Sequence, residues 1–353
     1  RVKEINKFAD YVPCAAHSLN LVGVEAASVV PDVISYFGVV QQLYVFFSAS
    51  PHRWNLLNQH AKLPLSVKGL SQTRWSSRYD AVHALKTSYS LIVTILETII
   101  NDNLEKNDCK MEAKKILGKL YKLEIAILTV VWEELLERIN KVSKKLQEPG
   151  LDLCEGLALI TSLEIFIKSL REKSNEKLIN YELRAKGFSS KVEENYSNAK
   201  NRIKIYKYSD GTTGTSPLQG REKFLVEVLN RLLDTLITEL TRRKDVYNEL
   251  GKKFKFLTDL TNKHVAHIDE DSVDCVLQCY NEDIELGLKN ECLQFKEYLK
   301  ISADLAQKRT VTCSDILDCI LKKNLIDIFP NLYTVVKIFL TLPVTSCEAE
   351  RAF

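Results

Sequence analysis

The sequence predicts a mainly α-helical protein. Apolar residues recur at steps of three and four over most of its 353 residues, the spacing that gives a helix one buried face. Only 12 Gly and 8 Pro are present, too few to supply the many turns of an all-β fold. Hydrophobic residues make up 45% and charged residues 27%, proportions that are typical of a globular protein.

The first predicted elements lie before residue 31. Residues 1–8 have the pattern of a helix end, and residues 11–15 form a short extended run because Pro13 cannot continue a helix. Residues 17–30 are then helical. A strand of about five residues is not stable alone, so we expect the run at 11–15 to pair with strands outside this sequence.

Most of the remaining chain has helical spacing. The longest amphipathic run covers residues 113–146 and ends at Pro149-Gly150. Residues 173–207 are strongly polar, and residues 209–220 have the Gly, Ser and Thr content of a linker. The other predicted helices cover residues 33–58, 73–100, 153–170, 222–250, 272–280, 286–305 and 314–323.

Charge and cysteine content restrict the function classes. The formal net charge is +3, too even to indicate nucleic-acid binding except through local patches. The 9 Cys are an odd number without framework spacing, which favours reduced thiols and argues against a structural zinc site. No run of about 18 apolar residues is present, so we expect neither a membrane span nor a membrane partner. Residue 1 is Arg rather than Met and no signal peptide is recognisable, so we expect a fragment of a longer chain.

The first motif is Cys14-x-x-His17, followed by Leu19, Asn20 and Leu21. It supplies two ligands where a structural zinc needs four, and no second pair stands nearby. Locally, the pattern is explained by a structural Cys14 packed in a strand and a His17 that caps the next helix.

The second motif is Thr73-Arg74-Trp75-Ser-Ser-Arg78. Trp75 is either an aromatic core anchor at a helix start or a platform for a nucleobase, because every base offers a face for stacking. Trp54 is a weaker competitor for the second role. Trp132 lies in the middle of a helix and is expected in the core.

The third feature is a basic segment without any acid. Such a run is either a solvated face or a site for phosphate contacts, and the sequence leaves both open. Weaker basic runs occur at residues 242–244 and 252–255. The residues of the segment are Lys200, Arg202, Lys204 and Lys207.

The C-terminal stretch combines an apolar stripe with a second helix start. Pro343 breaks the helical pattern, and residues 345–348 then fit a capping box. Glu350 follows one turn later. The stripe is compatible with burial in the core or against a partner chain, and its members are Leu332, Val336, Phe339 and Leu340.

In this order and at these separations, the blocks at residues 14–21, 73–78 and 343–353 resemble the hAT transposase superfamily, closest to the zinc finger MYM-type 1-like group. The resemblance implies that residues 1–30 are a remnant of an RNase H-like core whose first strands are missing. It further implies a helical insertion domain over residues 31–325 with the linker at 209–220. Residues 326–353 would hold the dimerisation region and the start of the final catalytic helix.

The resemblance also implies roles for individual residues. Glu350 would be the last acid of a metal-binding Asp-Asp-Glu triad that uses Mg²⁺, and Trp75 would stack on a flipped base. His17 and Arg74 would lie near the DNA, joined by Arg78 and the basic segment. The other two acids of the triad do not occur in this sequence, so for this chain we expect neither catalysis nor a bound metal.

The expected function is therefore protein dimerisation and DNA binding by a fragment of a hAT-type transposase or transposase-derived protein in the nucleus. Cleavage and strand transfer of DNA would belong only to an intact parent protein. The expected partners are a second copy of the chain, as a homodimer or higher oligomer, and DNA, with no small-molecule substrate. The alternative is a domesticated, non-enzymatic nuclear protein that dimerises and regulates.

Overall fold

The computed structural model describes residues 2–9, 12–60, 68–70, 75–148, 151, 153–197, 218–262, 265–308 and 311–342. It is mainly helical, as the sequence predicts, and no strand occurs in these described ranges. The run at 11–15 was expected to be extended, but Ala15 already begins helix α2 (Ala15–Val29). Tyr11 lies outside the described residues. The RNase H-like core stays a prediction.

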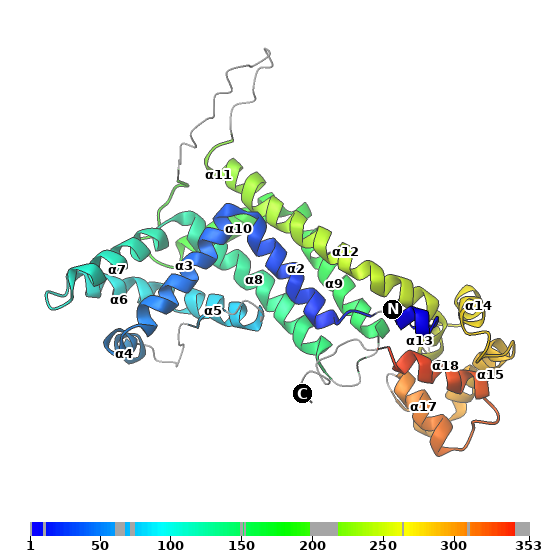
Figure 1. The fold of residues 1–353 in the computed structure, drawn as a ribbon. Coiled ribbons are helices and arrows are strands. Elements are labelled where there is room, and N and C mark those ends of the chain that lie inside the picture. Colours follow the sequence, from blue (N-terminus) through cyan, green and yellow to red (C-terminus); the bar gives the residue numbers. More distant parts are fainter. Residues whose placement is uncertain are drawn as a thin grey trace, which may run out of the picture. The chain divides into compact units, whose positions relative to one another are not determined.

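The chain divides into two compact units (Figure 1). Unit 1 comprises Arg1–Leu19, Val142–Ser162 and Leu240–Phe353, and unit 2 comprises Asn20–Lys141 and Leu163–Glu239. The domain limits expected from the sequence stay a prediction. The chain passes between the units within four helices, namely α2, α8 (Leu123–Leu146), α9 (Leu153–Glu172) and α12 (Arg231–Lys253).

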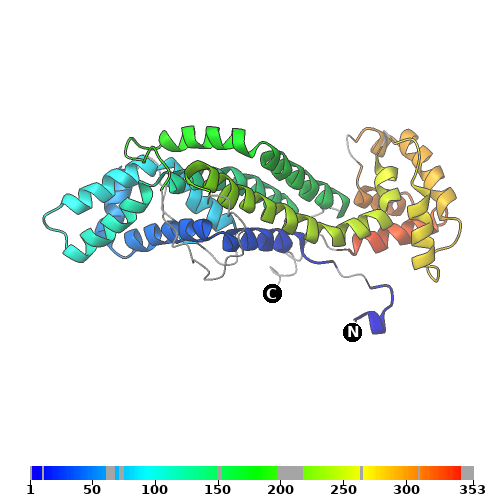
Figure 2. The ribbon, with the colours of Figure 1, turned by 90° about the horizontal axis from the view of Figure 1, so that it is seen from above.

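Unit 2 is built around an aromatic core. The side chain of Trp132 on α8 is fully buried, as predicted, and its ring meets that of Phe37 edge-on at a centroid distance of 4.9 Å. Helices α6 and α7 pack side by side as a hairpin, which both ribbon views show (Figures 1 and 2). The other helices of this unit are α3 (Pro31–Ser48), α4 (Pro51–His60), α5 (Trp75–Thr87), α6 (Tyr89–Asn101), α7 (Asn107–Leu120), α10 (Ser174–Lys186) and α11 (Gly220–Lys223).

Three helices predicted as single elements are each broken in two. The predicted helix 33–58 is divided at residues 49–50 into α3 and α4, and 73–100 is divided at Ser88 into α5 and α6. The long run 113–146 begins earlier, at Asn107, and is interrupted at residues 121–122 between α7 and α8. Each break lets the following helix turn and pack its apolar face on its neighbours.

The polar stretch 173–207 contains a helix that we did not predict. Helix α10 buries Leu178, Tyr181 and Ala185 at steps of three and four, while most of its remaining positions are polar. A second unexpected feature is the π-helical segment η1 (Phe224–Asn230) between α11 and α12. π-Helical turns are rare and usually occur as single insertions in α-helices.

Unit 1 has its own core, in which the ring of Phe254 lies 5.3 Å from that of Phe339. The buried carboxylate of Glu291 accepts hydrogen bonds from the Leu332 backbone amide at 2.8 Å and the Asn331 side chain at 2.6 Å. It thereby satisfies one of the free backbone amides at the start of α18 (Pro330–Leu340). The described helices of this unit also include α1 (Val2–Ile5), α13 (Lys255–Thr261), α14 (Glu270–Cys279), α15 (Leu288–Ile301), α16 (Ala303–Ala306), α17 (Cys313–Lys322) and α18 (Pro330–Leu340).

Among the described helices, none is by itself long and apolar enough to cross a membrane. The pair α2 and α3 meets the composition requirement only when joined, and the two are bent by 106° at the break between them.

Candidate functional site

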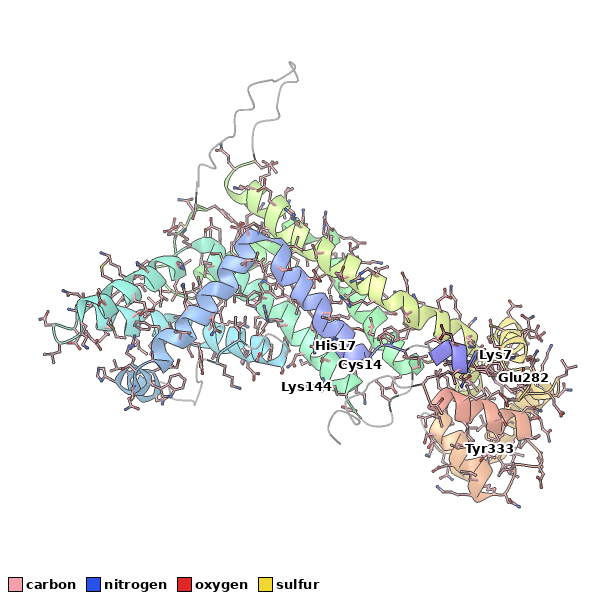
Figure 3. All side chains as sticks on the ribbon, in the orientation of Figure 1. Lys7, Cys14, His17, Lys144, Glu282 and Tyr333 are labelled. Carbon is pink, nitrogen blue, oxygen red and sulfur yellow. The ribbon has the colours of Figure 1, made fainter. Side chains whose placement is uncertain are left out.

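The segment of the first motif is held by Tyr247 of α12. Its hydroxyl donates a hydrogen bond to the carbonyl oxygen of Pro13 at 2.6 Å and lies 3.3 Å from the hydroxyl of Ser18. Cys14 is half-buried directly before α2, and His17 is exposed in the first turn of that helix (Figure 3). The structure therefore leaves His17 accessible to solvent while fixing the backbone around it.

The second motif is described only from its third residue. Trp75 is the first residue of α5, and its side chain lies outside the described part of the structure, as does Arg74. Arg78 is half-buried, with its guanidinium carbon 4.7 Å from the ring centroid of Phe37 on α3. Burial lowers the pKa of Arg78 below its ordinary range. Trp54, the competing aromatic residue, is half-buried on α4.

Several predicted site residues lie outside the described residues. Glu350 is among them, together with the capping box at 345–348 and the linker at 209–217. The four basic residues of the acid-free segment are also outside, namely Lys200, Arg202, Lys204 and Lys207.

The apolar stripe near the C-terminus lies mainly inside unit 1. Leu332, Val336 and Phe339 on α18 are buried, whereas Leu340 is 39% exposed. Helix α18 packs on α17 and α15 of the same chain. The sequence left burial in the core or against a partner open, and the first three side chains are core residues. Dimerisation itself stays a prediction.

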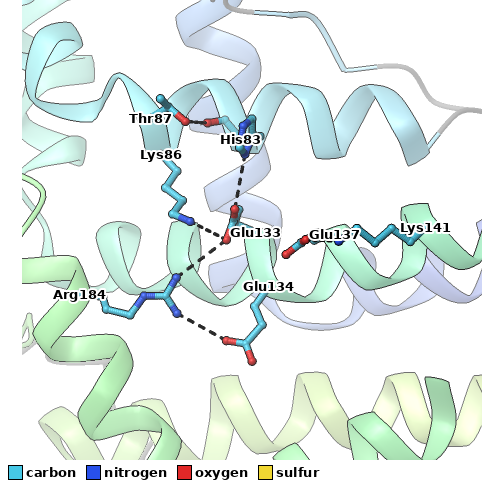
Figure 4. Close-up of polar contacts among 8 residues, drawn as sticks. All are labelled: His83, Lys86, Thr87, Glu133, Glu134, Glu137, Lys141 and Arg184. Atoms are coloured by element: carbon cyan, nitrogen blue, oxygen red, sulfur yellow. Dashed lines mark hydrogen bonds and ion pairs between the residues drawn. The ribbon is translucent and has the colours of Figure 1, made fainter. Parts of the chain in front are cut away.

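A cluster of charged side chains in unit 2 joins three helices (Figure 4). Its centre is Glu133 on α8, which is only 7% exposed although it is a carboxylate. The Lys86 ammonium of α5 lies 2.8 Å from it, and the His83 Nδ1 atom of the same helix lies 3.5 Å away. An Arg184 nitrogen of α10 lies 4.0 Å from the same carboxylate.

The next residue, Glu134, extends this cluster. Its carboxylate lies 3.6 Å from Arg184 and accepts a hydrogen bond from Lys177 at 3.3 Å. Burial, reinforced by the charge of Glu134, raises the pKa of Tyr181 above its ordinary range. The side chains of Glu134, Lys177 and Arg184 line a polar cavity of about 560 Å³ together with Arg138 and Glu137.

The cluster offsets acidic charge with basic charge from neighbouring helices. A carboxylate removed from water needs such partners, because an unpaired buried charge is strongly unfavourable. The arrangement therefore stabilises the packing of α5, α8 and α10. In the part of the chain that the structure describes, no three His, Cys, Asp or Glu side chains gather in a way that could hold a metal ion.

Sequence reasoning missed this cluster because its members are separated by up to about a hundred residues of chain. One local signal was present. Glu133 and Glu134 interrupt an otherwise apolar stretch of α8, and buried carboxylates in such a stretch require partners.

No protein-family model, curated protein or solved structure matches this chain. The family resemblance of the three sequence blocks therefore stays a prediction.

Proposed function

We propose that this chain binds DNA and dimerises in the nucleus, as part of a hAT-type transposase or a protein derived from one. The observation that carries the proposal is the occurrence of three blocks, at residues 14–21, 73–78 and 343–353, in the order and at the separations of that superfamily. Of the family's three catalytic acids, the resemblance assigns only Glu350 to this chain. Mg²⁺-dependent cleavage is therefore proposed for an intact parent protein alone.

Two features support this proposal. The described residues are mainly helical, as a large helical insertion domain requires. Trp75 is the first residue of α5, and stacking on an aromatic ring suits any base because every base offers a face. His17 is exposed near the start of α2, which suits a polar contact with DNA.

Base stacking by Trp75 can be tested with two duplexes that differ by one extrahelical base. Loss of one stacked base weakens binding by about 1–3 kcal/mol, or roughly fivefold to 150-fold. Fluorescence anisotropy should show this loss for Trp75→Ala on the duplex with the extrahelical base and little change on the paired duplex. The control is Trp54→Ala, whose affinity for both duplexes should equal that of the wild type. Equal losses for both variants would contradict the assignment.

Dimerisation can be tested by size-exclusion chromatography with light scattering at micromolar concentration. A mass of twice the 40.3 kDa of the chain, or a higher multiple, is expected. Leu340 is the exposed member of the apolar stripe, so Leu340→Glu should shift the protein toward the monomer without unfolding it. A wild-type protein that is entirely monomeric at this concentration would count against a dimer.

A further inference from the structure

Helix α7 carries lysines at a spacing that collects them on one side. Lys110, Lys114 and Lys122 are separated by four or eight residues, with Gly118 at the position between the last two. Residues four apart are neighbours on a helix surface, so Lys110, Lys114 and Gly118 form one row on α7. Lys122 lies in the break that follows the helix, two residues after its last residue, Leu120. The three lysines are called here the lysine face. Lys114 and Lys122 are exposed and Lys110 is half-buried.

The opposite side of α7 is committed to the interior of unit 2. Its buried residues are Ala113, Ile116, Leu117 and Leu120. On the lysine face, by contrast, a Cβ atom added to Gly118 would meet no atom within 4 Å. The middle of the lysine face is therefore open, and a large ligand can approach the helix there.

Lysine-face ammonium groups have no acidic partners among the described residues: no ion pair includes Lys110, Lys114 or Lys122. Some exposed lysines on other helices are paired, as the Lys168–Glu164 contact of 2.7 Å and the Lys322–Asp318 contact of 2.9 Å illustrate.

The acids of α7 lie away from the lysine face. Asp108 and Glu112 fall on the other edge of the helix, where they line a cavity of about 630 Å³ with Gln42, Lys115 and Lys119. Lys119 donates a hydrogen bond to the Gln42 side chain at 2.9 Å. The positive charge of the lysine face is therefore not offset from within its own helix.

We infer that the lysine face binds the phosphate backbone of double-stranded nucleic acid. Like charges one turn apart repel each other, and a polyanion is the ligand that relieves this repulsion. From Lys110 to Gly118 the row on α7 extends about 12 Å at 1.5 Å per residue, and Lys122 follows four residues further along the chain. Duplex DNA carries about one negative charge per 1.7 Å, so several phosphates lie within reach of the row. Contacts of this kind position the protein without reading the sequence.

Charge complementarity favours nucleic acid over a membrane surface. A helix that lies on a lipid surface inserts its apolar side between the headgroups, whereas α7 buries that side within unit 2. The inference deepens the proposed function and rests on it, because it assigns a surface to the DNA binding proposed above. It adds a contact that is independent of Trp75.

The test is the salt dependence of binding to a 20-base-pair DNA duplex of arbitrary sequence, measured by fluorescence anisotropy between 50 and 200 mM KCl. The triple variant Lys110→Gln, Lys114→Gln, Lys122→Gln removes three phosphate contacts. Each contact contributes about 0.9 to the slope of log affinity against log salt. The wild-type affinity should therefore fall about 40-fold more over this range than that of the triple variant.

A charge-matched control separates the lysine face from net charge. Lys173, Lys186 and Lys191 are exposed in and around α10 and take part in no ion pair among the described residues. The variant Lys173→Gln, Lys186→Gln, Lys191→Gln removes the same three charges and should keep the wild-type slope. Circular dichroism on both variants checks that the helices remain folded. Equal slopes for the two triple variants would overturn the inference.

The outcomes also separate this inference from the proposed function. If Trp75→Ala weakens binding while the lysine-face variant keeps the full wild-type slope, the proposed function stands and the lysine-face inference fails. If the wild type binds neither duplex at 50 mM KCl, both fail. Binding to a membrane is measured separately by sedimentation with phosphatidylserine vesicles. If the lysine face is needed for binding to vesicles and the protein does not bind DNA, the inference that its ligand is nucleic acid is wrong.

Discussion

Two groups of basic side chains in unit 2 differ in whether an acid lies beside them. In the charged cluster, Lys86 lies 2.8 Å from Glu133, whose side chain is 9% exposed, and Arg184 lies beside the same carboxylate. On the lysine face, Lys114 of α7 and Lys122 just after that helix are exposed and take part in no ion pair among the described residues. The first group neutralises acids, whereas the second leaves its charge to solvent.

Burial explains this difference. A carboxylate taken out of water loses several kcal/mol of hydration, so the fold tolerates Glu133 only with cations brought from α5 and α10. An exposed ammonium keeps its water and needs no partner. A buried charged side chain with oppositely charged neighbours therefore indicates a role in stabilising the fold. An exposed charged side chain without such a neighbour is available to bind a ligand.

The largest effect that would sharpen the comparison is expected for Glu133→Gln. The substitution keeps the side-chain volume but removes the charge that Lys86 and Arg184 offset, which leaves Lys86 without its acid and Arg184 with Glu134 alone. We expect the free energy of unfolding to fall by about 2 kcal/mol. Urea denaturation of the wild type and the variant measures this difference in the free energy of unfolding.

The matched control is Glu137→Gln, one turn further along α8. Glu137 has a side chain that is 32% exposed and pairs with Lys141 alone, so the change should cost below about 0.5 kcal/mol. Equal losses for the two variants would contradict the role assigned to burial.

A smaller expected effect is the pH dependence of the stabilisation that Glu137 contributes. A hydrogen bond from Lys141 is the main cause that lowers the pKa of Glu137 below its ordinary 4.5. Because the pKa is lowered in the folded state, the stabilisation is present above pH 4.5 and is lost as the pH falls through the folded pKa. The free-energy difference between wild type and Glu137→Gln should be about 0.4 kcal/mol at pH 7 and vanish near pH 3. A difference that is the same at both pH values would break this assignment.

Helix positions were largely predictable from the sequence, because apolar spacing alone locates the buried faces. The breaks between consecutive helices were harder to predict from the sequence. Pro51 begins α4 and was a usable signal for the end of α3, since proline favours the first helical position. The break after α7 has no such residue. It is stabilised by distant partners, with the Leu120 carbonyl accepting from the Tyr89 hydroxyl at 2.7 Å and the Tyr121 carbonyl accepting from the Glu193 amide at 2.7 Å.

The site was predictable to a smaller extent. The first motif marks the start of α2, but the bonds from Tyr247 that hold it come from more than two hundred residues away. The lysine face was missed because Asp108 and Glu112 are interleaved with its lysines in the sequence. Only the helical position separates the two charges, so a helical-wheel plot of residues 107–120 would have placed Lys110 and Lys114 apart from both acids.

The most direct test of the comparison is urea unfolding with and without a DNA duplex. A ligand that binds the folded state at 100 times its dissociation constant raises the free energy of unfolding by about 2.7 kcal/mol. Wild type and Glu133→Gln should gain this same increment, although the variant starts from a lower value. The lysine-face triple variant should keep wild-type stability without DNA and gain much less with it. If the triple variant gains the full wild-type increment, the charges of α7 do not bind DNA, and the division between the two groups of lysines is wrong.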